Sequence, residues 1–389
     1  MIIGYFSSTF PYSFSNPNYF CGGSSLATHS LVNEISTRDV DVKVFTTSAD
    51  SGDHLDSDGR MEIYRYATKI KLLTSPISPG LFHKPLEHDV DLVHVSFDMP
   101  PGPFAAYRYA RKKSLPLILT YHGDWDPDYG SFVRKVGVSI NNRFVSDLLS
   151  YANIIISPSK LYAEKSKYLS KYPDKISVIP NGIDLDEFQL NYSQSECREK
   201  LNLPLECKII LFFGYLTPYK GPDILLGVFR EVLKNHPDTI LLFAGNGNME
   251  DELKKLARQW NIQDNVIFAG FIEKKRRSLY YKSADIFCLP STMSTECYPL
   301  AILEAIASGV PVVTSDIGGI PDIIENNVNG LLVPPADAEK LEDNLNLLLQ
   351  NPEIGEKFSE NALKGIKKYS WKNIATETLK LYESLLENR

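Results

Sequence analysis

Short apolar runs alternate with helical patterns twice along this chain, and this alternation constrains the fold more than any other feature. Runs rich in β-branched and aromatic residues predict strands in the first half at Ile2–Ser7, Val42–Thr46, Ile63–Tyr66, Leu92–Val95, Leu117–Thr120, Ile154–Ser157 and Ile176–Ile179. Several are apolar throughout, which is typical of parallel strands covered on both faces. Helical stretches such as Ser24–Ser36 and Lys160–Leu169 lie between them. The pattern predicts a doubly wound α/β domain.

The pattern pauses over residues 183–206, which are polar and which we interpret as a linker with a short helix near Glu196–Leu201. Strands are then expected at Ile209–Phe213, Ile240–Ala244, Val266–Ala269, Ile286–Leu289, Val312–Thr314 and Leu331–Val333. Helices are expected at 222–235, 249–259, 299–308 and 337–349, and in the tail 353–389 with a break before Trp371. At about 150 residues per domain, a chain of 389 residues fits two domains. We expect them at 1–184 and 185–370.

Composition and the cysteine pattern narrow the class of protein. The net charge is −7, which disfavours a nucleic-acid-binding protein because such proteins are normally basic. The five cysteines include no CxxC pair, which disfavours a disulfide framework or a zinc site and indicates a reducing compartment. The first residues lack a signal-peptide pattern, and no apolar run approaches the about 20 residues of a membrane span. We therefore expect a soluble cytoplasmic protein.

A pair of carboxylates, Glu296 and Glu304, accompanies one of the expected helices. Pro299 suits a first helical position, so this helix is expected to run from Pro299 to Ser308. The helix is apolar on nearly every side and is therefore expected to be buried, with Glu304 paired or facing a polar cleft. The free N–H groups at its start favour an anion such as phosphate. The alternative is that one Glu complements the helix dipole and the other extends to solvent.

Two glycine loops and one histidine follow predicted strands. The segment Gly214–Gly221 brings Lys220 to a strand end, where its ammonium could contact a diphosphate. Gly22 and Gly23 open a helix and could present N–H groups to phosphate. His122 ends a strand, where it could hydrogen-bond a ligand or serve a structural role. Neither loop is GxGxxG, and no acidic residue ends the second strand, so a dinucleotide-dependent hydride-transfer enzyme is disfavoured.

The segment Asp124-Trp-Asp126-Pro-Asp128 has a spacing that suggests a metal site. A calcium loop fails, because Tyr129 stands where glycine is needed and Lys135 where glutamate is needed. We expect these carboxylates to cap the following helix or to contact a substrate, and we expect no metal.

Taken in order, these features resemble family-4 glycosyltransferases, which are retaining enzymes of the GT-B fold. The matching segments are Gly22-Gly23 with the helix to Ile35, the strand ending in His122, Val178-Ile-Pro-Asn-Gly-Ile-Asp184, Gly214–Gly221, Phe243-Ala-Gly-Asn-Gly247, Val266-Ile-Phe-Ala-Gly270, Glu296 with Glu304, Gly318-Gly-Ile-Pro-Asp322 and Asn329–Pro335. The resemblance implies two Rossmann-like doubly wound parallel-sheet domains facing across a cleft. The first would bind the acceptor and the second the donor, and a C-terminal helix at about 371–389 would cross back to the first domain.

The resemblance also implies an activity: retaining transfer of a hexosyl group from a UDP- or GDP-sugar to a hydroxyl of a glycan, a lipid-linked acceptor or a small molecule, with no metal or other cofactor. Glu304 is then expected to bind the ribose hydroxyls, and Glu296 and His122 the transferred sugar. The diphosphate would be bound by Lys220, by N–H groups near Leu300, and by Gly22 and Gly23. The other expected donor-binding residues are Tyr215, Gly245, Asn246, Phe271, Ile272, Tyr298 and Pro299.

Two positions depart from the family pattern. Tyr215 stands where the family often has Arg, which removes a bidentate phosphate donor, and Pro299 stands where many members have Gly and supplies no N–H. Lys220 would then carry more of the phosphate binding. The alternatives are a nucleotide-sugar epimerase or hydrolase on the same fold, or a non-catalytic sugar-nucleotide-binding subunit. The basic and apolar stretch Phe132–Val136 with Arg143 and Phe144 suggests peripheral contact with the inner membrane surface.

Overall fold

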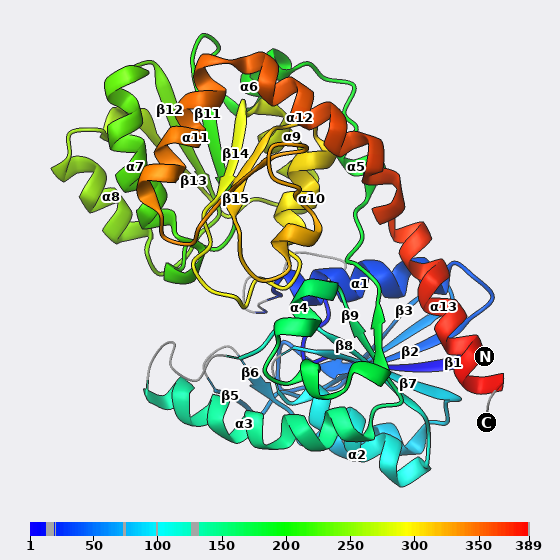
Figure 1. Cartoon of the computed structure of the whole chain (residues 1–389). Coiled ribbons are helices and arrows are strands. Elements are labelled where there is room, and N and C mark those ends of the chain that lie inside the picture. Colours follow the sequence, from blue (N-terminus) through cyan, green and yellow to red (C-terminus); the bar gives the residue numbers. More distant parts are fainter. Residues whose placement is uncertain (13–18, 20, 73–74, 99, 126–131, 388–389) are drawn as a thin grey trace. The chain divides into compact units, whose positions relative to one another are not determined.

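A computed structural model describes the chain except for residues 13–18, 20, 73–74, 99, 126–131 and 388–389. The chain divides into two compact α/β units, shown in Figure 1. Unit 1 consists of residues 1–182 together with 371–389, and unit 2 of residues 183–370. The C-terminal segment therefore belongs to the same unit as the N-terminus.

The described part of unit 1 is built on an eight-stranded sheet with the order β10-β9-β8-β7-β1-β2-β4-β3. Its strands are β1 (Ile2–Phe6), β2 (Asp41–Thr47), β3 (His54–Asp58), β4 (Met61–Tyr66), β7 (Leu92–Phe97), β8 (Leu117–Tyr121), β9 (Ile154–Ser157) and β10 (Ile176–Val178). All pair in parallel except β3, which runs antiparallel to β4. Every predicted first-half strand is found, so the predicted parallel sheet is confirmed. The edge strand β3 was missed because its residues are mostly polar.

Helices cover both faces of this sheet: α1 (Gly23–Ser36), α2 (Gly102–Lys113), α3 (Phe132–Tyr151), α4 (Lys160–Lys165) and α13 (Trp371–Glu387). A separate hairpin joins β5 (Ile70–Leu72) to β6 (Ser75–Ile77). Helix α3, which begins at Phe132, was not among the helix ranges expected from the sequence. Helix α13 packs on α1, and its Ile374, Ala375 and Tyr382 lie in one core cluster with Leu31 and Val32. The predicted return of the C-terminal helix to the first unit is confirmed.

Unit 2, all of whose residues are described, has a six-stranded parallel sheet with the order β13-β12-β11-β14-β15-β16. Its strands are β11 (Lys208–Phe213), β12 (Thr239–Ala244), β13 (Val266–Gly270), β14 (Ile286–Leu289), β15 (Val312–Ser315) and β16 (Leu331–Val333). Its helices are α5 (Leu185–Phe188), α6 (Gln194–Leu201), α7 (Pro222–Asn235), α8 (Glu250–Gln259), α9 (Arg277–Ser283), α10 (Leu300–Ala307), α11 (Ala338–Gln350) and α12 (Pro352–Gly365). Each predicted second-half strand is present. Helix α10 starts one residue later than expected, with Pro299 as its N-cap.

The strand order reverses direction once in each sheet. In unit 1 this switch point lies between β1 and β7, and in unit 2 between β11 and β14. Parallel doubly wound sheets bind ligands outside the carboxyl ends of their strands at such a point. A ligand site is therefore expected in the loops that follow these four strands. Within the described ranges, no helix is both long and apolar enough to cross a membrane.

Candidate active site

The loops that follow β11 and β14 are joined at the switch point of unit 2. The amide of Thr292 donates to the carbonyl of Tyr219 at 2.7 Å. At Gly221, which ends the short 3₁₀ turn Pro218–Lys220, φ is +68° and a Cβ atom would lie 2.3 Å from the carbonyl oxygen of Pro290. Only glycine accepts this conformation and this approach without strain. Gly221 thus fixes the backbone position of the preceding residue, Lys220.

Lys220 forms a buried ion pair with Glu296. The Nζ atom of Lys220 lies 2.6 Å from Oε1 of Glu296, and the side chains are 15% and 8% exposed. The hydroxyl of Ser291 donates to the same oxygen at 3.1 Å. Burial lowers the pKa of Lys220, but the Glu296 carboxylate and Tyr219 together raise it more, so that the pKa ends above its usual value. The ammonium is therefore charged at every physiological pH and can neutralise an anionic ligand.

The Gly318-Gly319 pair holds the loop that carries Glu296. The amide of Gly319 donates to the carbonyl of Glu296 at 2.9 Å. Gly318 has φ of +59°, and a Cβ atom there would lie 2.1 Å from the same carbonyl oxygen. The close backbone approach explains why glycine is required at this place in the loop after β15. A segment distant in sequence thus positions the Glu296 carboxylate.

The glycines after β11 and β12 form a second close backbone contact. At Gly245, φ is +135° and a Cβ atom would lie 1.9 Å from the carbonyl oxygen of Gly214. The amide of Leu216 donates to the carbonyl of Asn246 at 2.9 Å. These contacts hold the loop that carries Tyr215, whose side chain is 44% exposed. Tyr215, Gly245 and Asn246 therefore lie at neighbouring strand ends, in the same part of the unit as Lys220.

Glu304 is buried on α10 and is paired. It is 8% exposed, Nη1 of Arg277 donates to its Oε1 at 3.2 Å, and the hydroxyl of Tyr281 donates to its Oε2 at 2.7 Å. The pairing satisfies the requirement that a carboxylate in an apolar helix must have partners. Neither Arg277 nor Tyr281 was predicted, because α9 is a short helix with no motif to mark its inward face.

The remaining predicted donor-binding residues differ in how exposed their side chains are. Phe271 is 69% exposed, whereas Ile272 is buried in the core of unit 2. Tyr298 is also in this core, with its ring 6.2 Å from that of Tyr369. The side chains of Ile272 and Tyr298 thus pack inside the unit. Pro299 and Leu300 lie at the start of α10.

In unit 1, His122 follows β8 directly and is bound to a buried polar chain. Its Nε2 atom lies 3.0 Å from the hydroxyl of Ser96, which is in turn hydrogen-bonded to Thr28 of α1. Burial lowers the pKa of His122 to about 4, so the imidazole is neutral at physiological pH. A neutral imidazole has one donor and one acceptor nitrogen. With Nε2 occupied by Ser96, Nδ1 is the nitrogen left to contact a ligand.

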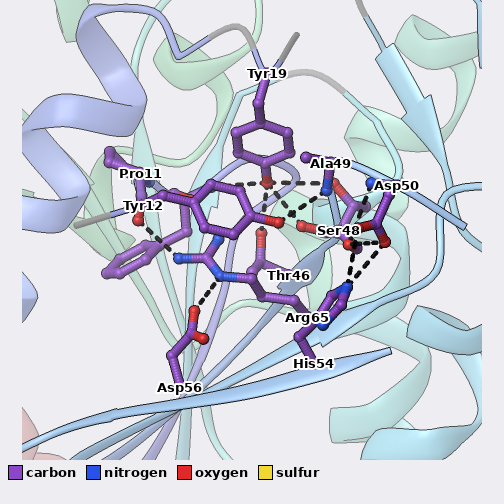
Figure 2. A network of polar contacts seen from close by, with 12 residues as sticks. Pro11, Tyr12, Tyr19, Thr46, Ser48, Ala49, Asp50, His54, Asp56 and Arg65 are labelled. Carbon is purple, nitrogen blue, oxygen red and sulfur yellow. Dashed lines mark hydrogen bonds and ion pairs between the residues drawn. The ribbon is translucent and has the colours of Figure 1, made fainter. Parts of the chain in front are cut away.

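Gly22 and Gly23 stand at the start of α1, after a loop that Arg65 anchors (Figure 2). The buried guanidinium of Arg65 donates to Asp56 and to the carbonyls of Phe10 and Pro11, at 2.6, 2.6 and 2.8 Å. It also lies 3.7 Å from the centre of the Tyr12 ring. A Cβ atom at Gly23 would meet no described atom within 4 Å. Packing therefore does not require glycine there, and the space is open.

Asp124 has a structural role. It accepts hydrogen bonds from Tyr121 at 2.7 Å, Ser166 at 2.7 Å and the amide of Lys167 at 3.1 Å, and so joins β8 to the region after α4. Asp126 and Asp128 lie outside the described residues. Among the residues that the structure describes, no cluster of three or more His, Cys, Asp or Glu side chains could hold a metal ion.

Two doubly wound units with a buried cation and carboxylates at strand carboxyl ends are typical of proteins that bind nucleotide-like anions. The family model described as "Glycosyl transferases group 1" matches residues 193–365, and the one described as "Glycosyltransferase Family 4" matches residues 21–187. The two halves of the chain thus each match a glycosyltransferase family model, as the sequence motifs predict.

Relatives and solved structures agree with this assignment. The chain is 31% identical over 264 residues to the α-monoglucosyldiacylglycerol synthase of Streptococcus pneumoniae, covering 64% of this chain and 58% of that protein. It spans about three fifths of the length of the curated relatives that it matches. The sucrose-phosphate synthase of Thermosynechococcus elongatus has a TM-score of 0.84 at 21% identity and covers 100% of both chains. Anabaena HepE in complex with UDP-glucose has a TM-score of 0.78 at 18% identity, covering 99% of this chain and 100% of that one. The GT-B fold is thereby confirmed.

Proposed function

We propose that this protein is a retaining glycosyltransferase that moves a hexosyl group from a UDP- or GDP-sugar to a hydroxyl acceptor. The observation that carries the proposal is the buried Lys220–Glu296 pair at the switch point of unit 2, with Ser291 bound to the same carboxylate oxygen. A cation in such a place suits a diphosphate leaving group. The UDP-glucose bound by HepE, whose fold this chain shares, supports a nucleotide-sugar donor.

The roles proposed for single residues are those that the family resemblance implies, and the positions of the side chains support them. Lys220 and the N–H groups at the start of α10 stabilise the charge that develops on the departing diphosphate. Glu296 binds hydroxyls of the transferred sugar, and Glu304 binds the ribose. The main chain at Tyr215, Gly245, Asn246, Ile272, Tyr298 and Pro299, together with the exposed Phe271, contributes to the rest of the donor site. In unit 1, we propose that His122 binds the transferred sugar and that Gly22 and Gly23 bind the diphosphate.

Catalysis in this proposal depends on charge and orientation. The donor's glycosidic C–O bond breaks and leaves an oxocarbenium-like sugar that Glu296 holds in place. The acceptor oxygen bonds to the anomeric carbon from the face that the diphosphate leaves, and the departing phosphate oxygen takes the proton of the acceptor hydroxyl, so the anomeric configuration is retained. The protein provides the cation, the hydrogen bonds and the exclusion of water, and the reaction requires no metal ion.

The proposal is tested by a screen followed by product analysis. Nucleoside diphosphates and their sugars are screened by thermal shift, because a ligand that binds the native state raises the melting temperature. Donors that bind are then incubated with glycan, lipid and small-molecule acceptors, with and without EDTA. Mass spectrometry and the anomeric configuration of the product are expected to show EDTA-resistant transfer with retention. An inverted product, or a loss of transfer in EDTA, would contradict the mechanism.

A second candidate is a non-catalytic sugar-nucleotide-binding subunit. It is favoured by Tyr215, which supplies no cation where the family often has Arg. A non-catalytic subunit would bind the donor but would transfer sugar to none of the acceptors tested. Release of free nucleotide without an acceptor would instead indicate an epimerase or a hydrolase.

We also propose that unit 1 contacts a membrane-borne acceptor from the cytoplasmic side. On α3, Val136 and Phe144 are 44% and 49% exposed, and the exposed Lys135 and Arg143 stand beside them. Apolar side chains flanked by basic ones suit an anionic lipid surface. The name of the Streptococcus relative, a synthase of a glycosylated diacylglycerol, supports a lipid acceptor. Flotation with phosphatidylglycerol vesicles but not phosphatidylcholine vesicles is expected, and the double variant V136S/F144S should no longer float.

A further inference from the structure

Helix α9 directs two side chains at the carboxylate of Glu304. Arg277 donates to Oε1 at 3.2 Å and Tyr281 to Oε2 at 2.7 Å. The two donors lie one turn apart on the same helix, so they share one face of it. Glu304 is 8% exposed, which shields both contacts from water. The orientation of this carboxylate is therefore determined by α9.

The two donors leave Glu304 with unused acceptor capacity. An ionised carboxylate offers about four lone-pair sites, two on each oxygen. Within the described part of the chain, Arg277 and Tyr281 provide its side-chain hydrogen bonds, one to each oxygen. Each oxygen can therefore accept one more donor. Two adjacent hydroxyl groups, such as the 2′- and 3′-hydroxyls of ribose, match this pair of acceptors.

Tyr281 is itself rigidly held. Its side chain is fully buried, its ring stacks on Phe213 with centroids 4.8 Å apart, and it meets the edge of Phe188 at 5.8 Å. Burial and the neighbouring Glu304 carboxylate raise the pKa of Tyr281 well above its usual value. The hydroxyl therefore remains a donor over the whole physiological pH range.

Arg277 also interacts with a second carboxylate, Glu187 of α5. The Oε2 atom of Glu187 lies 3.7 Å from Nζ of Lys274, and its Oε1 atom is buried without a hydrogen-bond partner among the described residues. Burial raises the pKa of Glu187, while Lys274 and Arg277 oppose this change. Removing Arg277 would leave Glu187 and Glu304 with less compensating positive charge, and Oε1 of Glu304 would lose its hydrogen bond to Arg277.

We propose that Arg277 and Tyr281 are positioning residues, which hold Glu304 in the orientation that receives both ribose hydroxyls and so select ribonucleotides over 2′-deoxyribonucleotides. The inference rests on the proposed function, because it takes the ribose of a nucleoside diphosphate as the ligand of Glu304. Their effect is on donor binding, so their loss should raise the KM for the donor and leave kcat largely unchanged.

The experiment measures the affinity of UDP, GDP and ADP and of their 2′-deoxy counterparts by isothermal titration calorimetry. The wild type is expected to bind at least one ribonucleotide about tenfold more tightly than its deoxy form, the effect of one hydrogen bond to a charged group. In R277A and Y281F, this ratio is expected to fall below about threefold. R277K should recover part of it, because lysine keeps the charge without the planar fork.

The matched control is R276A, which removes the same charge from the exposed neighbouring residue and should leave the ratio unchanged. A second control is E304Q. If Arg277 acts through Glu304, adding R277A to E304Q should cause no further change in the ratio. Melting temperatures identify any variant that unfolds. Y281F keeps the ring stacked on Phe213, so it tests the inference even where R277A does not fold.

The outcomes separate this inference from the proposed function. A ribonucleotide preference that survives intact in Y281F and in folded R277A would overturn the positioning role and leave the proposed function standing. A wild type that binds none of the three ribonucleotides would overturn the proposed function and the inference with it.

Discussion

Lys220 and Glu296 depend on each other, because both are largely shielded from solvent and each is the other's counter-charge. Buried ion pairs add little net stability, but removing one partner leaves an uncompensated charge. Retaining such a pair is better explained by what the charges do for a ligand. A diphosphate that approaches Lys220 would share its ammonium with Glu296, so binding and sugar orientation would be coupled at one atom.

The first prediction concerns Lys220. In K220A, turnover is expected to fall at least about 100-fold at saturating donor, since the variant loses the charge that stabilises the leaving diphosphate. The measurement is kcat for the donor and acceptor found in the screen. K234A is the control, because Lys234 is a surface residue that is 68% exposed and should not affect turnover. Turnover of K220A close to that of the wild type would contradict the proposed role.

The second prediction concerns the pH dependence of stability. His94 is fully buried between Tyr382 and Thr120, and burial lowers its pKa to about 3. An unfolded histidine has a pKa of about 6.5. Between this pH and about pH 3, the unfolded state therefore binds more protons than the folded state. The free energy of unfolding should therefore fall as the pH decreases through this window, by up to about 1.4 kcal/mol per pH unit from His94.

Denaturant unfolding of unit 1 between pH 4 and 7 provides the measurement. The H94Q variant should be less stable at pH 7 and should show a shallower pH slope. An equal slope in H94Q and the wild type would contradict this account, because it would mean that His94 binds its proton equally well in the folded and the unfolded state.

Some residues of the candidate site could be predicted from the sequence, and others could not. Lys220, Glu296 and Glu304 were predicted as site residues because each stands in a motif at a strand or helix end. Ser291, Arg277 and Tyr281 were not, because serine, arginine and tyrosine are common in such segments and only the folded chain brings them to a carboxylate.

At the level of elements, the glycine turns decide where the functional side chains stand. Gly221 illustrates this, since its positive φ and its approach to Pro290 fix the start of α7 and the position of Lys220 together. The long apolar strands were predicted reliably because burial on both faces leaves a continuous apolar run. The edge strand β3 escaped prediction because its pairing with β4 is a tertiary contact that leaves little apolar pattern.

The third prediction contrasts two glycines. G221A is expected to lose about 2 kcal/mol or more of unfolding free energy and to lose activity, because a Cβ atom cannot fit and the backbone is strained. G227A is the control within α7, where a Cβ atom meets nothing within 4 Å. It should be neutral or stabilising by about 0.5–1 kcal/mol, because alanine favours a helix interior. Thermal and denaturant unfolding distinguish the two. Equal stability of both variants would contradict the packing argument.

At the level of the whole molecule, the chain leaves unit 1 once and returns to it at Trp371. The two ends of unit 2 touch there: the amide of Ile183 donates to the carbonyl of Tyr369 at 2.7 Å. Within unit 1, a Cβ atom at Gly182 would lie 2.5 Å from the ring of Trp371. The stability of unit 1 therefore depends on residues at the far end of the sequence.

The fourth prediction follows from this connectivity. Truncation after Ser370 removes Ile374, Ala375 and Tyr382 from the core of unit 1 and should destabilise that unit by several kcal/mol, at about 1.5–3 kcal/mol for each large side chain. Unit 2 should retain its stability. Hydrogen exchange resolves the two units, and protection lost in β1 and α1 but kept in β11 and β12 is the expected pattern. Uniform loss would show that the units unfold together.

The sequence alone determined most strands, most helices, the parallel sheets and the resemblance to the family, because these depend on local apolar patterns and on glycine, proline and carboxylate motifs at element ends. Tertiary structure decided which side chains meet. Arg277 and Tyr281 reach Glu304, Ser291 joins Lys220 at Glu296, and Ser96 occupies one nitrogen of His122. These contacts join elements far apart in sequence, and a hydrogen bond depends on placement to a fraction of an ångström, which periodicity and spacing do not encode.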